Sequence, residues 1–250
     1  MKKKLTLFFS FNLLCLVVAN AQTTKVTKID HDYNLEEKYH VLKADKPIKD
    51  GPYEAHTIYS NVQLTVGAYK NGQKDGLWKQ YDIGHRLIEE GSYKDGQKTG
   101  IWSTYDWKGN LTSQYDHTSA KLLLYKPTPP DTSRSFYVIN GTDTVQTDLD
   151  RAPVYLDGTQ MALRIIMSTI RYPVKARINN IQGIVLVGFT VGADGQISGY
   201  HIVKSLGGGC DEEALTVVKK LNGDWLSGVL NGKAVAVMYI LPIKFSSASH

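Results

Sequence analysis

The sequence predicts an α+β fold in two parts: an N-terminal antiparallel β-meander built from repeats, and a small three-stranded antiparallel sheet with helices on one face. Two observations lead to this prediction. A 24-residue repeat with strand-like alternation fills the middle of the chain, and the last third has the pattern helix, hairpin, helix, strand. We therefore divide the chain into residues 1–21, 22–125, 126–151 and 152–246.

The first 21 residues have the features of a Sec signal peptide. Lys2–Lys4 is basic, Leu5–Val18 is apolar, and Ala19–Ala21 matches an A-x-A cleavage site. The apolar stretch is shorter than the roughly 20 residues that span a bilayer. We expect cleavage after Ala21 and a location in the periplasm or cell envelope. The alternative is an uncleaved inner-membrane anchor that carries a periplasmic domain.

Cleavage would also change the charge and the cysteine content of the chain. The full sequence has a formal net charge of +5 and two cysteines. Loss of three lysines and of Cys15 leaves a charge of about +2 and Cys210 alone. We therefore expect no nucleic-acid partner, no internal disulfide, and membrane contact only through partner proteins unless the N-terminus is uncleaved.

The repeat itself consists of "GAYKNGQKDGLW" (67–78) and "GSYKDGQKTGIW" (91–102), with a fainter copy "KDGPY" (49–53) before them. Asn71-Gly72 and Asp95-Gly96 are residue pairs typical of tight hairpin turns, because both types accept positive φ. Alternating segments between such turns predict an antiparallel meander from roughly Tyr39 to Tyr125.

These residues resemble the MORN-type repeat, in the antitoxin-like variant of bacterial and envelope proteins. The rings are expected to pack across strands, and a ligand-stacking platform is the alternative. The matching positions, which we expect to be structural, are Gly67, Tyr69, Gly72, Gly76, Trp78, Gly91, Tyr93, Gly96, Gly100 and Trp102.

The segment 126–151 begins with "KPTPPD", whose prolines predict a stiff, extended linker. A hairpin around Asn140-Gly141 is expected after it. The last third then predicts a helix over 158–170, which ends before Pro173, and a short helix over 174–179. Two strands joined at Ala193–Gly195 follow, then a helix over 211–221 and a last strand over 234–245.

In this last third, four motifs occur in order: "APVYLDGTQMALRIIMSTIRYP", "IQGIVLVGFTVGADGQI", "GGGCDEEALTVVKKL" and "LPIKF". Together they resemble the C-terminal domain of TonB over about Ala152–Phe245. The resemblance implies a periplasmic domain that binds outer-membrane transporters by adding a receptor segment to its sheet edge. The cleavable N-terminus and the repeat-containing spacer depart from TonB, and "WLSGVLNGKAV" (225–235) lacks a proline that the family often has there.

The resemblance also assigns residues to roles. The last strand is the candidate partner-binding edge, with Val235, Val237, Met238, Tyr239 and Ile240. Structural positions of the family motif are Tyr172, Pro173, Gly183, Asp194, Gly195, Asp211, Ala214, Leu215, Trp225, Pro242 and Phe245.

The stretch "SLGGGCDEEAL" (205–215) invites two catalytic or ligand-binding interpretations that its own charges disfavour. A phosphate loop at the helix N-terminus conflicts with Asp211, Glu212 and Glu213, and the Walker pattern is absent. The same carboxylates oppose a Cys210 thiolate, so we expect a packing cysteine, with Cys210 or Asp211 capping the helix. The seven histidines show no metal-ligand spacing.

We therefore expect a non-enzymatic periplasmic protein without cofactor or metal. Its partner would be a protein, either a segment of an outer-membrane TonB-dependent receptor in TonB-linked energy transduction or another envelope protein. The alternative is a free-standing envelope scaffold, or an antitoxin-like MORN protein, with no role in energy coupling. An exposed sheet edge would also allow a homodimer.

Overall fold

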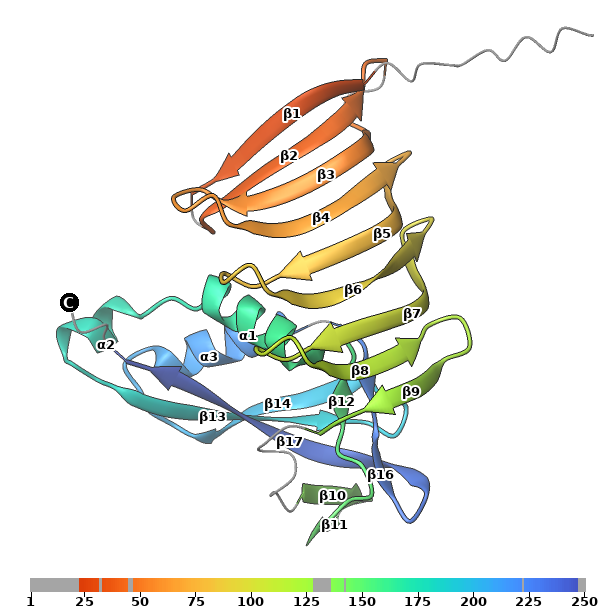
Figure 1. Ribbon diagram of the computed structural model, residues 1–250. Helices are drawn as coiled ribbons and strands as arrows, with labels where there is room; N and C mark the ends of the chain where they lie inside the picture. The colour runs from red at the N-terminus through yellow and green to blue at the C-terminus, as the bar shows by residue number, and fades with distance from the viewer. Residues whose placement is uncertain are drawn as a thin grey trace, which may run out of the picture.

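The computed structural model describes residues 23–31, 33–44, 47–127, 136–141, 143–221 and 223–246. The predicted signal peptide, residues 1–21, lies outside the described residues, as do residues 128–135 of the predicted linker. The described chain contains two large antiparallel sheets, a two-stranded pair and three helices (Figure 1). None of these helices is long and apolar enough to cross a membrane.

The first sheet is a nine-stranded meander in which each strand pairs with its neighbours in the chain. It rises as one tall layer above the rest of the molecule (Figure 1). It confirms the predicted meander and begins earlier than the predicted start at Tyr39. Its strands are β1 (Thr23–Asp30), β2 (Leu35–Leu42), β3 (Lys49–Thr57), β4 (Gln63–Lys70), β5 (Gln73–Tyr81), β6 (Leu87–Lys94), β7 (Gln97–Tyr105), β8 (Leu111–Asp116) and β9 (Lys121–Tyr125).

The predicted hairpin turns have the backbone that their residues favour. Asn71 and Gly72 have φ values of 50° and 81°, and Asp95 and Gly96 have 49° and 81°. Two successive positive φ values are typical of a type I′ turn, whose twist matches that of the strands it joins. The repeat therefore sets the register of β4 with β5 and of β6 with β7.

The second sheet has the strand order β11-β10-β17-β13-β14, and β16 pairs with one end of β17. The predicted three-stranded core of β13, β14 and β17 is present, but three more strands extend it. The turn at Asn140-Gly141 forms as expected, and its hairpin joins this sheet rather than serving as linker. The strands are β10 (Phe136–Asn140), β11 (Asp143–Thr147), β13 (Gly183–Val191), β14 (Ile197–Lys204), β16 (Gly228–Leu230) and β17 (Lys233–Phe245).

Three helices and a small strand pair complete the fold. The helices are α1 (Gly158–Thr169), α2 (Val174–Ile178) and α3 (Cys210–Val218), each within three residues of its predicted bounds. The strands β12 (Val154–Tyr155) and β15 (Trp225–Leu226) pair with each other. Helix α1 lies between the meander and α3, so it contacts both parts of the molecule (Figure 1).

The core of the second part lies between its sheet and the helices. Val185, Val187, Phe189 and Val191 of β13 are all at most 2% exposed, as the alternation of the sequence predicts. They pack against α3 and the end of β17. Burial of each such side chain contributes about 1.5–3 kcal/mol to stability, so β13 is the central element of this core.

Candidate protein-binding surface

The repeated aromatic residues of the meander form a packed row on one face. The Trp78 ring lies over Gly67 and the Trp102 ring over Gly91, so closely that a Cβ on either glycine would overlap the ring. The indole nitrogens donate to the carbonyls of Ala68 and Ser92, at 3.2 and 3.1 Å. This explains why each repeat has a glycine eleven residues before its tryptophan.

Tyrosine and lysine side chains cover the same row. Tyr69 and Tyr93 meet Trp78 and Trp102 edge-on, with ring centroids 5.3 and 5.0 Å apart. Lysines at equivalent repeat positions, 49, 74 and 98, place Nζ 5.0, 4.4 and 3.9 Å from the centroids of rings 53, 78 and 102. The tryptophans are 1% and 2% exposed, so the packing interpretation fits the structure and a stacking platform does not.

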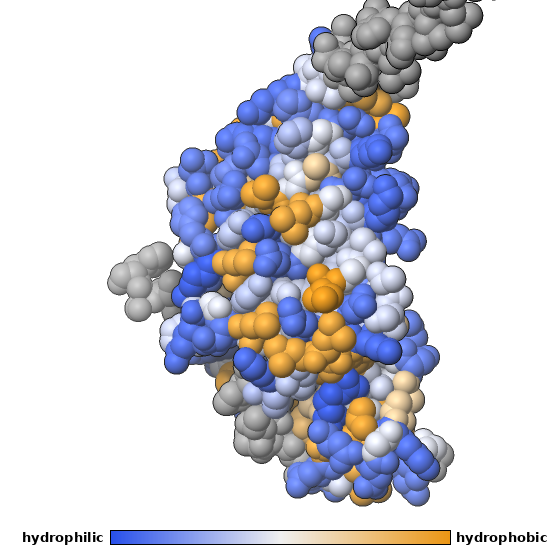
Figure 2. Space-filling view, turned by 45° about the vertical axis from the view of Figure 1, so that its right-hand side comes forward, coloured by the Kyte–Doolittle hydropathy of each residue, from blue (hydrophilic) through white to orange (hydrophobic). Residues whose placement is uncertain are grey.

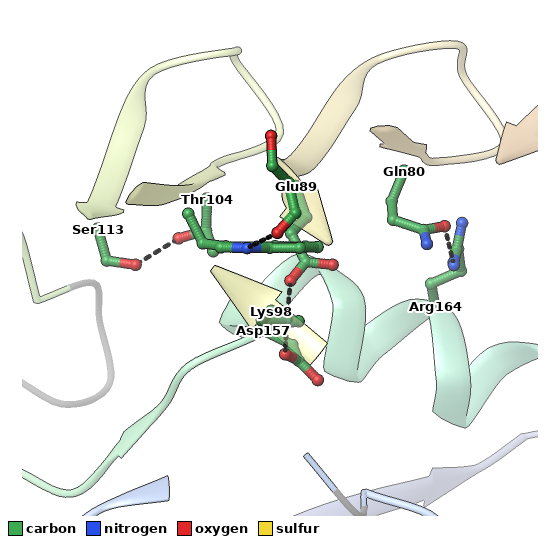
Figure 3. A network of polar contacts seen from close by, with 9 residues as sticks. Gln80, Glu89, Lys98, Thr104, Ser113, Asp157 and Arg164 are labelled. Carbon is green, nitrogen blue, oxygen red and sulfur yellow. Dashed lines mark hydrogen bonds and ion pairs between the residues drawn. The ribbon is translucent and has the colours of Figure 1, made fainter. Parts of the chain in front are cut away.

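The last lysine of this row, Lys98, also binds the second part of the molecule (Figure 3). Its Nζ lies 2.6 Å from Glu89 Oε1 on β6 and 2.5 Å from Asp157, the residue before α1. Attraction to these carboxylates outweighs the effect of burial and raises the pKa of Lys98. Burial raises the pKa of Glu89 to about 7, and the neighbouring Asp157 carboxylate acts in the same direction.

A second set of contacts joins α1 to the strands β4 and β5 (Figure 3). Arg164 donates to the carbonyls of Leu64 and Tyr81, at 2.8 and 3.0 Å, and to Gln80 Oε1 at 2.8 Å. Gly158, with φ of +82°, begins α1 so close to Thr104 that a Cβ would approach within 2.8 Å. These contacts hold the meander and the second sheet in one arrangement.

The structure corrects the predicted binding edge. Val237 pairs with Val191 on one side and Val138 on the other, and Met238 likewise lies between β13 and β10. Val235 pairs with Gly228 of β16. The prediction of a free edge is wrong at Val237 and Met238, because β10 pairs with β17 on the side opposite β13. Tyr239 and Ile240 continue the pairing with β13.

Farther along β17, Pro242 limits what this side of the strand can donate. Pro242 lies opposite Leu186 of β13. A proline has no N–H and cannot take part in a hydrogen-bonded antiparallel pair, so its carbonyl points away from β13. Within strands, proline is found where its missing N–H would face away from the paired neighbour. A strand added on that side of β17 would therefore find no backbone N–H at Pro242.

The strand at this edge of the second sheet is β11, and not β17 as the sequence predicted. A row of four valines crosses the paired strands, and its exposure increases from the core outward: Val191 0%, Val237 0%, Val138 7% and Val145 55%. Val145 is on β11, which pairs only with β10 among the described strands. The row stops at a half-covered apolar side chain that one further strand would bury.

The opposite edge, β14, is irregular. Its pairing with β13 shifts register twice, and Gly199 has φ of +66°. The His201 ring nitrogen Nδ1 is 2.8 Å from the carbonyl oxygen of Gly199. Bulges of this kind bend an edge strand and disfavour pairing with another chain.

The residues assigned from the family motif occupy packing and turn positions. The Tyr172 hydroxyl donates to the carbonyl of Ile181 at 2.7 Å, and its ring meets Phe245 edge-on at 6.0 Å. Gly183 begins β13 where a Cβ would lie 2.8 Å from Leu206. Pro173 precedes α2.

The turn between β13 and β14 and the strand β15 contain three more of these residues. The Asp194 carboxylate accepts the N–H of Gln196 at 3.0 Å, and Gly195 has φ of +81° next to the carbonyl of Trp225. The Trp225 ring lies 5.5 Å from both Phe189 and Tyr239. The indole nitrogen of Trp225 is buried without a hydrogen-bond acceptor in the part of the chain that the structure describes.

The glycine-rich stretch before α3 is a turn held by Asp211. Its carboxylate accepts the N–H groups of Leu206 and Gly207 and the hydroxyl of Ser205. These hydrogen bonds outweigh partial burial and hold the pKa of Asp211 below its usual range. The predicted side-chain cap is wrong, because α3 begins at Cys210 after Gly209, whose φ is +90°.

Cys210 and two neighbours on α3 are part of the core. Cys210 and Ala214 are fully buried, and Leu215 packs partly buried beside them. Burial raises the pKa of the Cys210 thiol, and Asp211 and Glu212 act in the same direction. Across the described ranges no group of three His, Cys, Asp or Glu residues could hold a metal ion.

Comparison with known proteins gives one informative match. Residues 168–247 match the model of a family described as the Gram-negative bacterial TonB protein C-terminal domain. No curated protein matches the chain. This similarity covers β13, α3, β17 and β14, the elements whose packing is described above.

Two solved structures are similar at a low level. A point mutant of S. aureus TarM, in complex with fondaparinux, alpha-GlcNAc-glycerol and UDP, has a TM-score of 0.25 and 8% identity, and a second TarM structure has 0.24 and 7%. The matches cover 40% and 41% of this chain but 21% of each TarM chain. TM-scores this low do not indicate a shared fold.

Proposed function

We propose that this chain is a non-enzymatic cell-envelope protein whose second sheet binds an extended segment of a partner protein along β11. The similarity of residues 168–247 to the TonB C-terminal family supports a protein-binding role in envelope energy transduction. TonB C-terminal domains are periplasmic in Gram-negative bacteria and bind proteins such as outer-membrane receptors. The proposed partner is therefore a receptor segment that faces the periplasm.

The observation that carries this proposal is the valine row that ends at Val145. An added strand would cover this side chain and extend the row by one position. The donors available to it follow from the pairing. The backbone nitrogen and carbonyl of Pro242 point away from β13, so the N–H and C=O groups of Met238, four residues earlier, also point away from β13 and toward β10. Backbone groups alternate between the two sides of each strand. Following this alternation from β17 through β10 places the N–H groups of Thr144 and Gln146 on the outer side of β11.

A titration of the mature, isotope-labelled chain with a receptor-derived peptide tests this function. The peptide is the periplasm-facing N-terminal segment of an outer-membrane TonB-dependent receptor. We expect saturable shifts of the β10 and β11 amide resonances. Gln146→Pro removes one outward donor and should abolish binding, whereas Gln146→Ala keeps the donor and should bind normally. Absence of any shift in the folded chain would overturn the proposal.

We further propose that the first 21 residues are a cleaved signal peptide, so that the chain acts without an inner-membrane anchor of its own. The basic, apolar and A-x-A segments of the sequence support this. Mass spectrometry of the protein from the envelope fraction should give an N-terminus at Gln22. An intact N-terminus would instead support an anchored energy transducer.

We also assign the meander to the MORN type, in its antitoxin-like variant. The glycine, tyrosine and tryptophan positions that recur in both copies, together with the structural roles they occupy, support this assignment.

The outer strands β1 and β9 each pair with one neighbour among the described strands, which favours dimerisation through an edge. Sedimentation velocity at two concentrations distinguishes a dimer from a monomer.

A further inference from the structure

A cleft of about 430 Å³ lies between the meander and the second sheet, away from β11. One wall comes from the end of β8 with Tyr115 and His117. The other comes from the β13–β14 turn with Asp194 and from the segment at β15 with Asp224 and Trp225. Clefts between two packed parts of a protein are common positions for ligand sites.

Among the described residues that line it, the cleft carries negative charge only. Asp194 and Asp224 line it, and neither lysine nor arginine does. Burial lowers the pKa of His117, and nearby Lys98 acts in the same direction, so both disfavour the charged imidazolium. The cleft thus presents two carboxylates without a fixed cation between its walls.

Asp224 is the better placed of the two carboxylates to bind a ligand. In the described ranges its side chain has no ion pair, while its backbone carbonyl accepts the N–H of Leu156 at 2.9 Å. Its charge acts on both Tyr115 and His117 of the opposite wall. One carboxylate oxygen of Asp194, Oδ1, accepts the N–H of Gln196 in the turn. The other oxygen, Oδ2, is the one that a ligand would contact.

Aromatic side chains lie beside these carboxylates. Tyr115 and His117 meet edge-on at 4.8 Å on one wall, and Trp225 is on the other. Tryptophan and tyrosine faces attract cations, and this attraction strengthens where water is excluded. Hydrophobic side chains gather in several patches among hydrophilic ones on one outer face of the molecule (Figure 2). The cleft instead combines acidic and aromatic groups in one place.

We propose that this cleft binds an organic cation, a guanidinium or primary ammonium group, between Asp224 and Asp194 with an aromatic wall beside it. The cation could be a free small molecule or the basic side chain of a bound peptide. The proposal does not depend on strand addition at β11.

Titration of the mature chain with n-butylguanidinium at low ionic strength tests this site, since salt screens such contacts. The readout is the indole N–H resonance of Trp225, identified with Trp225→Phe. We expect saturable shifts for the cation and none for the neutral isostere n-butylurea. Asp224→Asn should weaken binding about tenfold, the loss expected for a hydrogen bond to a charged group. Asp95→Asn, in the β6–β7 turn, should leave it unchanged.

Two blocked peptides distinguish the sources of the cation. Gly-Gly-Arg-Gly-Gly should bind more tightly than n-butylguanidinium if the ligand is a peptide side chain, and more weakly if it is a free cation; Gly-Gly-Gln-Gly-Gly should not bind. Equal binding of n-butylurea, or unchanged affinity in both Asp224→Asn and Asp194→Asn, would overturn the proposal. So would the absence of saturable shifts with the cation.

Discussion

Lys98 of β7 and Asp157, the residue before α1, form an ion pair of 2.5 Å across 59 positions of the sequence. The same ammonium group lies 2.6 Å from Glu89, whose side chain is 4% exposed. This lysine therefore connects the meander, through β6 and β7, to the start of the helix that packs on the second sheet. The two parts share one buried polar junction.

Lys98→Met should destabilise the protein because it leaves the buried Glu89 and the partly buried Asp157 without their cation. Breaking a buried ion pair in this way costs about 3–5 kcal/mol. We expect a loss near the lower end in urea denaturation, because Glu89 can bind a proton and become neutral. Lys94→Met is the control, since Lys94 forms only exposed contacts and should change stability by less than about 0.5 kcal/mol. Equal stability of both variants would contradict the role of Lys98.

The raised pKa of Glu89 predicts a pH dependence of stability. A carboxyl group with a pKa of about 7 in the folded state and about 4.3 in the unfolded state binds more protons when folded between these values. The free energy of unfolding should therefore fall as the pH rises through this window. Urea denaturation of wild type and Glu89→Gln between pH 4.5 and 8 isolates the effect. A wild-type-minus-variant difference that stays flat or rises with pH would contradict it.

Gly91→Ala should destabilise the meander because the new methyl group would overlap the Trp102 ring. Overpacking of this kind costs about 1–3 kcal/mol, and the Trp102 indole would also lose its hydrogen bond to Ser92. Gly84→Ala is the matched control, because its nearest neighbours are the far ends of the Asp82 and Arg86 side chains in a turn, at 3.2 Å or more, and not an aromatic ring. The melting temperatures of the two variants should differ clearly, and a Gly91→Ala protein as stable as the control would disprove the packing role of the repeat.

Cys210 should react slowly with thiol reagents in the folded protein. Its side chain is fully buried and its pKa is raised by burial and by Asp211 and Glu212, so little thiolate is present and access is closed. Modification by Ellman's reagent should be at least about a hundredfold faster after unfolding in urea. A fast reaction in the folded chain would revive the nucleophile interpretation.

The sequence predicts most local structure of this chain because its signals are local. The residue pairs Asn71-Gly72 and Asp95-Gly96 are each sufficient to predict a hairpin turn. The large apolar side chains at every second position from Val185 to Val191 predict a buried face of one strand. The sequence also predicts that the repeated rings pack across strands, but the contact of each tryptophan with the glycine eleven residues before it emerges only from the structure.

The position of the binding edge could not be predicted in the same way. Whether β17 ends the sheet depends on its pairing with β10, about a hundred residues earlier in the chain, and no local pattern in either strand encodes a partner at that distance. The Asn140-Gly141 turn predicts the hairpin but not the sheet it joins. Likewise, Arg164 resembles any helical arginine until the fold places it on the carbonyls of Leu64 and Tyr81.

Amide hydrogen exchange of the mature chain, with and without saturating receptor peptide, tests the central claim most directly. The outward N–H groups of Thr144 and Gln146 should exchange quickly in the free protein, because no described strand pairs with that side of β11. Strand addition predicts that both become protected by at least about tenfold when the peptide binds. Protection that appears on β14 instead, or binding without protection of Thr144 and Gln146, would contradict the proposal.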